Sequence, residues 1–226
     1  MLTRPSASIL AAVLAANAAS AADLAVAGGG TIPIFELPSL YLHVGVAGIF
    51  NDPHARISLA GSPVSGAAVK IGDRAAFAIE AGYFVAPHIA VSVSGGAPPI
   101  SKVEAAGSLS GLGAIGKTQG GPVSATVHYH FDGFGAFQPY LGTGVSALVV
   151  FGDEDRLLHR YRTEDAVGPV LQAGFDLMLD TRWGIFFDAK KGFLATTTKG
   201  YLSGIPVRSS VSLDPVVIHS GLTYRF

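Results

Sequence analysis

The sequence predicts an all-β fold, an eight-stranded antiparallel up-and-down transmembrane β-barrel whose N- and C-termini both lie in the periplasm. The first observation behind this prediction is composition: 49% of the residues are hydrophobic and only 14% are charged, whereas soluble proteins have about 25% charged residues. The second is that apolar residues alternate with polar or small ones along short segments, as in membrane-barrel strands. The third is that short and long connections between these segments alternate along the chain.

The N-terminal residues have the three-part pattern of a secretory signal peptide. Arg4 provides a short basic region, residues 9–16 form a brief apolar stretch, and residues 19–21, Ala-Ser-Ala, have the small-x-small form of a cleavage site. The alternative is a frayed N-terminal helix. The expected domains are a signal peptide over residues 1–21 that is cleaved after Ala21 or Ala22, an N-terminal periplasmic segment over residues 22–40, and a transmembrane β-barrel over residues 41–226.

Composition also narrows the possible functions. Beyond residue 22 there is no run of about 18 uninterrupted apolar residues, so no transmembrane helix is predicted. Apart from a helix, a closed barrel is the structure in which every backbone N–H and C=O group within the lipid can form a hydrogen bond. The absence of cysteine excludes a disulfide framework, a thiolate zinc site and a cysteine nucleophile. A net charge of -1 offers no concentrated basic face for nucleic acid.

Eight segments show the strand alternation. The last is the clearest, because Ile218, Leu222 and Tyr224 share a face that suits lipid, whereas His219 and Arg225 share the face toward the lumen. A soluble lipocalin-like barrel would reverse the two faces, and the charged residues within the strands argue against it because they lie opposite the apolar face. The expected strands cover residues 41–50, 75–85, 88–97, 123–132, 137–151, 167–179, 183–192 and 216–226.

The connections between these strands alternate in length. The short ones are residues 86–87, 132–136 and 180–182. The long ones are predicted to be loops and are residues 51–74, 98–122, 152–166 and 193–213. Short periplasmic turns that alternate with long extracellular loops are typical of outer-membrane barrels.

Aromatic residues gather near the short connections and the C-terminus. Because aromatic side chains concentrate at membrane–water interfaces, this end of the barrel is predicted to lie at the periplasmic interface. The predicted periplasmic aromatic girdle consists of Tyr83, Tyr129, Phe131, Phe137, Trp183, Tyr224 and Phe226.

Charged residues within the strands are expected to meet inside the barrel. An eight-stranded barrel has an interior that side chains can just fill, and buried charges must pair to avoid a large desolvation cost. We therefore predict a polar plug in the periplasmic half of the lumen, which would prevent an open aqueous pore. Its predicted members are Glu80, Asp176, Asp188, Lys190 and Arg225. The candidate apolar channel lining above it is Ile49, Leu148 and Val150.

Several segments resemble the OmpW family of outer-membrane proteins. They are residues 137–144 (FQPYLGTG), residues 127–131 (VHYHF), residues 111–117 followed by Gly121-Pro122, and the closing segment 211–226. The resemblance implies a monomeric eight-stranded barrel with a narrow, partly hydrophobic passage that takes up small hydrophobic molecules. Some members are also surface receptors for bacteriocins. The expected partners are outer-membrane lipid and lipopolysaccharide, a small hydrophobic ligand, and the barrel-assembly machinery, which would recognise the C-terminal strand.

Other motifs do not support a different chemistry. Residues 111–118 (GLGAIGKT) match a phosphate-binding loop in letters, but Gly120 to Pro122 would stop the helix that such a loop needs, so a flexible external loop is predicted. His128 and His130 share one strand face, but a metal site needs three or four ligands. His219 and Ser220 point to opposite faces of a strand and cannot form a nucleophile–base pair. No catalytic residue, metal or cofactor is therefore predicted.

The favoured function is a channel for passive uptake of small hydrophobic molecules, which leave sideways into the membrane or through a constriction. One alternative is a structural or receptor barrel without transport. Another is an outer-membrane enzyme that acts on lipids, which would require a converging Ser, His and acidic set that the sequence lacks. The acidic run 153–155, with Arg156, Arg160 and Arg162 after it, is interpreted as a solvated loop surface, with lipopolysaccharide phosphates as the alternative ligand.

Overall fold

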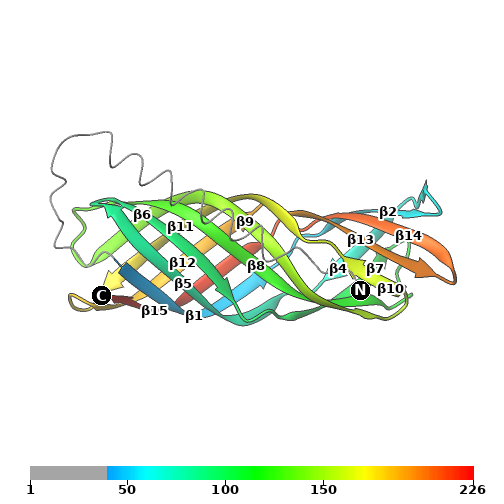
Figure 1. The fold of residues 1–226 in the computed structure, drawn as a ribbon, viewed down its shortest axis with the longest axis horizontal. Coiled ribbons are helices and arrows are strands. Elements are labelled where there is room, and N and C mark those ends of the chain that lie inside the picture. Colours follow the sequence, from blue (N-terminus) through cyan, green and yellow to red (C-terminus); the bar gives the residue numbers. More distant parts are fainter. Residues whose placement is uncertain (1–39) are drawn as a thin grey trace, which may run out of the picture. The chain divides into compact units, whose positions relative to one another are not determined.

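The structure is a computed structural model that describes residues 40–226 (Figure 1). The regular elements in this part of the chain are all β-strands. None of its residues forms a helix that is long and apolar enough to cross a lipid bilayer. The predicted signal peptide, residues 1–21, and the predicted periplasmic segment up to residue 39 lie outside the described residues.

Eight antiparallel strands close into a barrel. Their order around the ring is β8-β6-β5-β1-β15-β12-β11-β9, and β9 pairs with β8 to complete it. These strands are β1 (Leu40–Phe50), β5 (Arg74–Ala86), β6 (Ile89–Gly96), β8 (Ala114–His130), β9 (Phe137–Asp155), β11 (Ala166–Met178), β12 (Trp183–Gly192) and β15 (Val216–Arg225). All eight predicted strands are therefore confirmed, with the closing strand β15 paired to β1 from Tyr41↔Arg225 to Phe50↔Val216.

The two faces of the barrel wall differ sharply in polarity. The outer surface carries exposed apolar side chains such as Val46, Phe77 and Leu171, which are 59%, 55% and 54% exposed. The side chains of Glu80 and Asp188 point inward and are fully buried. This is the reverse of a soluble barrel, so the lipocalin-like alternative is excluded.

The connections confirm the predicted alternation of length, but the long ones are not loops. The short ones lie at the end that holds the C-terminus, called here the short-turn end; the long ones extend the opposite, long-loop end (Figure 1). The long connections contain further strands: β2 (His54–Leu59), β3 (Ser62–Pro63), β4 (Ala67–Ile71), β7 (Ile100–Gly107), β10 (His159–Thr163), β13 (Ala195–Leu202) and β14 (Ile205–Ser212).

These additional strands continue the barrel wall beyond the ring. One group forms the sheet β10-β13-β14-β2-β3. In the other, β7 forms a hairpin with the extended β8, and β4 pairs with the other edge of β7. The prediction of loops was wrong because these connections also alternate, so that Ile57, Val69 and Val211 point inward and are buried together with Leu194 and Leu213. Burial of apolar side chains stabilises the strands in place of solvated loops.

Candidate functional site

The lumen near the long-loop end contains an apolar cavity of about 220 Å³, called here the outer cavity. The predicted lining residues Ile49 and Leu148 both face it. Val150 is buried but is not one of the residues that line it. Most of the lining was missed, because it comes from connections that were predicted as loops. These missed residues include Ile57, Val69, Val103, Leu157, Leu194, Val207, Val211 and Leu213.

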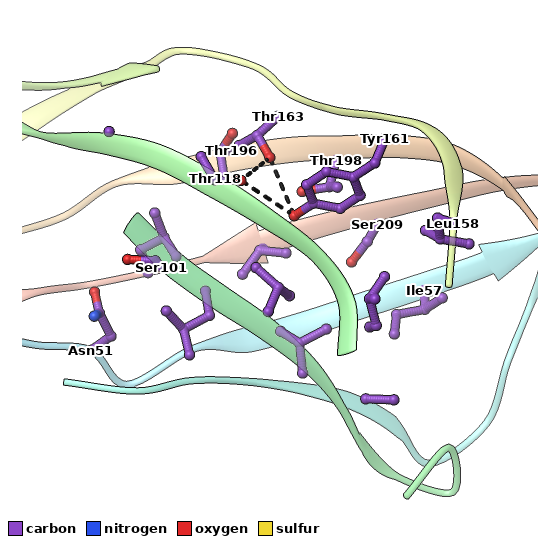
Figure 2. Close-up of a pocket in the computed structure, with 18 of the residues that line it drawn as sticks. Asn51, Ile57, Ser101, Thr118, Leu158, Tyr161, Thr163, Thr196, Thr198 and Ser209 are labelled. Atoms are coloured by element: carbon purple, nitrogen blue, oxygen red, sulfur yellow. Dashed lines mark hydrogen bonds between the residues drawn. The ribbon is translucent and has the colours of Figure 1, made fainter. Parts of the chain in front are cut away.

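A small group of hydroxyls interrupts the apolar wall of the outer cavity. Figure 2 shows Thr118, Tyr161 and Thr163 joined by hydrogen bonds; Thr118 Oγ1 lies 3.0 Å from Thr163 Oγ1 and 3.1 Å from Asp153 Oδ1. The Tyr161 ring is fully buried and packs directly over Gly116, where an added Cβ would lie 2.6 Å from the ring. Glycine is thus required on β8 for this ring to enter the lumen.

A second, smaller cavity of about 50 Å³, the middle cavity, continues the outer cavity toward the short-turn end. Ile49 and Pro215 line both cavities, so the two adjoin. Lys190 and His219 also line the middle cavity. A molecule that passes through the outer cavity would therefore reach charged and polar side chains there.

Below the middle cavity lies a buried ion-pair cluster made by Glu80, Asp188 and Lys190. Lys190 Nζ lies 2.7 Å from Glu80 Oε2 and 2.6 Å from Asp188 Oδ1. The Gln172 amide donates to Asp188 Oδ2, as does the Tyr140 hydroxyl at 3.1 Å. Such hydrogen bonds offset the cost of burying two carboxylates beside one ammonium group.

A second ionic pair lies closer to the short-turn end. Arg225 Nη2 lies 2.9 Å from Asp176 Oδ2. His43 Nε2 lies 3.0 Å from Asp176 Oδ1, but the angle of this contact does not meet that of a hydrogen bond. The His43 ring stacks on Phe186 at a centroid distance of 4.1 Å, and the Arg225 guanidinium lies over the Phe84 ring. The five predicted plug residues thus form two groups, Glu80 with Asp188 and Lys190, and Asp176 with Arg225.

The predicted plug left out the other members of this polar region. They are Tyr41, His43, Thr126, His128, Tyr140 and Gln172, all buried. Gln172 connects the parts, because its Oε1 accepts from Thr126 Oγ1 at 2.8 Å and its amide nitrogen lies 3.3 Å from Glu80 Oε2. The inward position of these residues in the strand alternation was the available signal.

Comparison with known proteins identifies this architecture. The sequence profile of the OmpW family matches residues 37–226. The chain belongs to the OmpW family. Its fold resembles the outer-membrane protein OprG from Pseudomonas aeruginosa, with a TM-score of 0.78 and 20% identity over 84% of this chain and 99% of that chain.

Two curated relatives of this OmpW-family protein have similar sequences along most of their length. The dibenzothiophene metabolism operon protein PahQ of Pseudomonas aeruginosa is 29% identical over 84% of this chain and 90% of its own. The outer membrane protein AlkL of Ectopseudomonas oleovorans is 29% identical over 75% of this chain and 74% of its own. Family membership places the protein in the bacterial outer membrane, where the exposed apolar surface contacts lipid.

The predicted aromatic girdle surrounds the short-turn end of this OmpW-family barrel. Six of its members are exposed, from 38% for Phe131 to 57% for Phe226, and Tyr224 is half-buried. The Tyr224 ring lies between Trp183 and Phe226, with centroid distances of 4.6 and 4.9 Å. This arrangement suits an interface between lipid and water.

One stretch of the barrel wall lacks the usual backbone pairing. The β6–β8 ladder ends at Ser94↔Ser124, and the β7–β8 ladder ends at Ile100↔Gln119. Between them, residues 95–99 face residues 120–123; we call this stretch the wall gap. Its prolines have no N–H to donate, and the Gly120 N–H donates to the Pro99 carbonyl across it at 3.3 Å. Wall-gap residues Gly95, Gly96, Ala97, Pro99, Gly121 and Pro122 also line the middle cavity.

The remaining sequence motifs take structural positions. Residues 114–118 are part of β8, so the prediction of a flexible loop was wrong for them, while Gly111 and Gly113 form the hairpin tip with φ of 95° and 76°. Strand β8 stands where a phosphate-binding loop needs a helix. His128 and His130 are buried in the lumen. Among residues 40–226, no group of three or more His, Cys, Asp or Glu could hold a metal ion.

Proposed function

We propose that this protein is a passive channel for small hydrophobic molecules, which enter the outer cavity from the long-loop end and leave sideways through the wall gap into the membrane. The long-loop end would face the outside of the cell and both termini the periplasm. The observation that carries the proposal is an apolar outer cavity that continues through the middle cavity to the buried ion-pair cluster and to the wall gap. No catalysis is part of this function.

The straight route through the barrel is unfavourable for an apolar guest. The guest would have to separate Lys190 from Glu80 and Asp188, which are all almost completely buried. Breaking a buried ion pair leaves an uncompensated charge and costs about 3–5 kcal/mol. The ion-pair cluster, together with Asp176 and Arg225, would therefore act as the plug that the sequence predicted.

The sideways route is supported by the wall gap. Opening a normal barrel wall would expose unpaired backbone groups to lipid, which costs several kcal/mol for each group. Pro98, Pro99 and Pro122 have no backbone N–H that could be left unpaired when the gap widens. A guest in the middle cavity is already in contact with Pro99 and Pro122.

The relatives support the same chemical class of cargo. PahQ is a dibenzothiophene metabolism operon protein, and dibenzothiophene is an apolar tricyclic compound. Such a compound dissolves poorly in a charged, hydrated surface layer but readily in a bilayer. A cavity that carries such a compound past this layer into the membrane would allow faster entry than diffusion through the layer alone.

The test is uptake of labelled dibenzothiophene by cells with and without the protein. The variant Gly121→Leu adds a side chain at the junction of the two cavities, where the nearest atoms are Pro99 Cδ at 3.6 Å and Pro98 Cα at 3.9 Å. We expect it to lower uptake toward that of cells without the protein. Gly152→Leu is the matched control, because its side chain would meet open space. Equal uptake with and without the wild-type protein would instead favour a structural or receptor barrel.

The long-loop end also carries a candidate surface for lipopolysaccharide. Arg162, Lys199 and Arg208 lie directly opposite one another on β10, β13 and β14, and all three are exposed. Like charges at opposite positions of a sheet are destabilising. Of these three residues, only Lys199 forms an ion pair in the described part of the chain, and its partner is Glu164. Phosphate groups would neutralise this basic row. At the other end, the exposed Phe226 would be available to the barrel-assembly machinery.

A further inference from the structure

One hydroxyl in the outer cavity is buried without a hydrogen-bond partner. The Ser209 side chain is 7% exposed, lines the cavity, and its Oγ makes no hydrogen bond in the part of the chain that the structure describes. Buried polar groups are almost always paired, so an unpaired one needs an explanation. Because Ser209 faces the cavity, a molecule inside the cavity could provide the missing partner.

Ser209 belongs to a row of hydroxyls that crosses three strands. Thr163 on β10 pairs with Thr198 on β13, and Thr198 pairs with Ser209 on β14. All three residues line the outer cavity, and Figure 2 shows Thr198 near Tyr161, whose hydroxyl contacts Thr163. These three residues, called here the hydroxyl row, place several hydrogen-bonding oxygens at one level of an otherwise apolar wall.

We propose that the hydroxyl row binds the single neutral oxygen of an otherwise apolar guest, so that the outer cavity favours ketones and alcohols over pure hydrocarbons. This inference rests on the proposed uptake function and names the chemical class of its cargo. A pure hydrocarbon leaves the Ser209 hydroxyl unpaired, whereas a ketone oxygen accepts a hydrogen bond from it. A site that hydrogen-bonds its ligand discriminates against an analogue without the bonding group for this reason.

The cavity is less suited to a carboxylate. Arg74 is the one charged residue among the described residues that line it. Its guanidinium already donates from Nε to the Ile100 carbonyl at 3.1 Å and from Nη1 to the Asp73 carbonyl at 2.8 Å. The hydroxyl row itself carries no charge. A neutral oxygen therefore fits the chemistry of this wall better than an anion does.

The experiment compares two probes in the same cells. Cells that make the full chain receive an equimolar mixture of n-undecane and methyl octyl ketone, which have equal numbers of heavy atoms, below saturating concentrations. Uptake of each is measured by gas chromatography against cells without the protein. Ser209→Ala removes the unpaired hydroxyl. Ser210→Ala is the matched control, because Ser210 is exposed on the other face of β14. Immunoblots of outer membranes verify equal amounts of each variant.

We expect Ser209→Ala to lower ketone uptake about three- to tenfold, as for loss of one hydrogen bond, while undecane uptake stays unchanged. Ser210→Ala should keep the wild-type ratio of ketone to alkane uptake. If Ser209→Ala also keeps that ratio, the hydroxyl row does not select the cargo and the inference is overturned, although uptake itself stands. If the wild-type protein raises uptake of neither probe, the uptake function fails instead.

Discussion

Near the short-turn end, the lumen is filled by hydrogen-bonded charged and aromatic side chains, whereas near the long-loop end it contains an apolar cavity of about 220 Å³. Glu80, Asp188 and Tyr41 in the first region are at most 1% exposed. In the second region, Ile49 and Leu148 are only partly buried because they face empty space. The wall around both regions is antiparallel sheet, and the inward side chains are charged and polar in the first region and mainly apolar in the second. This difference teaches that one barrel can be closed in one half and open to a guest in the other.

The largest expected effect comes from breaking the ion-pair cluster. Lys190→Met leaves the buried carboxylates of Glu80 and Asp188 without their cation, and we expect the free energy of unfolding in lipid to fall by about 3–5 kcal/mol. Urea unfolding of the barrel in vesicles measures this change. The control is Lys102→Met at the long-loop end, which breaks the exposed ion pair with Glu104 and should cost at most about 1 kcal/mol. Equal losses in the two variants would remove the distinction between the two regions.

The same contrast explains which parts of the plug the sequence could predict. Charged residues such as Glu80 and Lys190 stand out because the predicted strands contain few others. Members such as His43 and Gln172 were left out of the predicted plug, because alternation shows only that a residue points inward and not which partner it meets across the barrel. Gln172 and Glu80, for example, are 92 positions apart in the chain. A contact between residues so far apart in the chain depends on how the barrel closes and on the register of its strands, and the pattern of a single strand does not show either.

The strands at the long-loop end could not be predicted for a different reason. In β14, Val207, Ser209 and Val211 point inward, while the outward residues Arg208 and Ser210 are polar. A membrane-spanning strand is recognised by an apolar outer face, and the polar outer face of β14 does not match that pattern. Val150 is buried, as is expected of an inward residue, but it does not line the outer cavity. The β8–β9 register shifts beside it, because Gln119 pairs with Gly152 and Gly120 with Val150, and such an irregularity disrupts the ladder locally.

Packing density offers a second comparison of the two regions. A Cβ added at Gly82 would lie 2.0 Å from the Tyr41 ring, which is itself almost fully buried. We expect Gly82→Ala to lower the free energy of unfolding by about 1–3 kcal/mol, because a filled core resists added volume. Gly121→Ala, beside the cavities, has 3.6 Å to its nearest neighbour and should change stability by no more than about 0.5 kcal/mol. Urea unfolding of both variants would reveal whether the polar region is as tightly packed as its contacts indicate.

The basic row tests the outer surface of the long-loop end. Replacing Arg162 and Arg208 by Gln should weaken binding of purified lipopolysaccharide, with a loss of about 1 kcal/mol for each charge. The remaining affinity should depend less on salt concentration, because fewer phosphate contacts remain to be screened. Arg182→Gln, in a turn at the short-turn end, is the control and should bind as the wild type does. Unchanged affinity in the double variant would mean that the basic row does not bind lipopolysaccharide and is only a solvent-exposed surface.

The smallest expected effect concerns the β9–β10 hairpin at the long-loop end. The backbone N–H groups of Arg160 and Tyr161 donate to the Asp155 carboxylate at 2.8 and 2.9 Å and hold its pKa below the ordinary value. The hydrogen bond from the Arg160 N–H also supports Arg160 in a left-handed conformation with φ of 52°, which is unfavourable for a residue with a side chain. Since the folded-state pKa is the lower one, the stabilisation is complete above the unfolded value of about 3.9 and disappears as the pH falls through the folded-state value.

Hydrogen exchange of the Arg160 and Tyr161 amides measures this effect once rates are corrected for intrinsic exchange. In the wild type, their protection should be constant at neutral pH and fall below about pH 4. In Asp155→Asn, the protection of these two backbone amides should be weaker and should not change with pH, because an asparagine side chain does not titrate. The backbone amides of β12, in the lipid-enclosed wall, should stay protected throughout. Simultaneous loss of protection in β12 and in the hairpin would mean that the two ends of the barrel do not respond independently to acid.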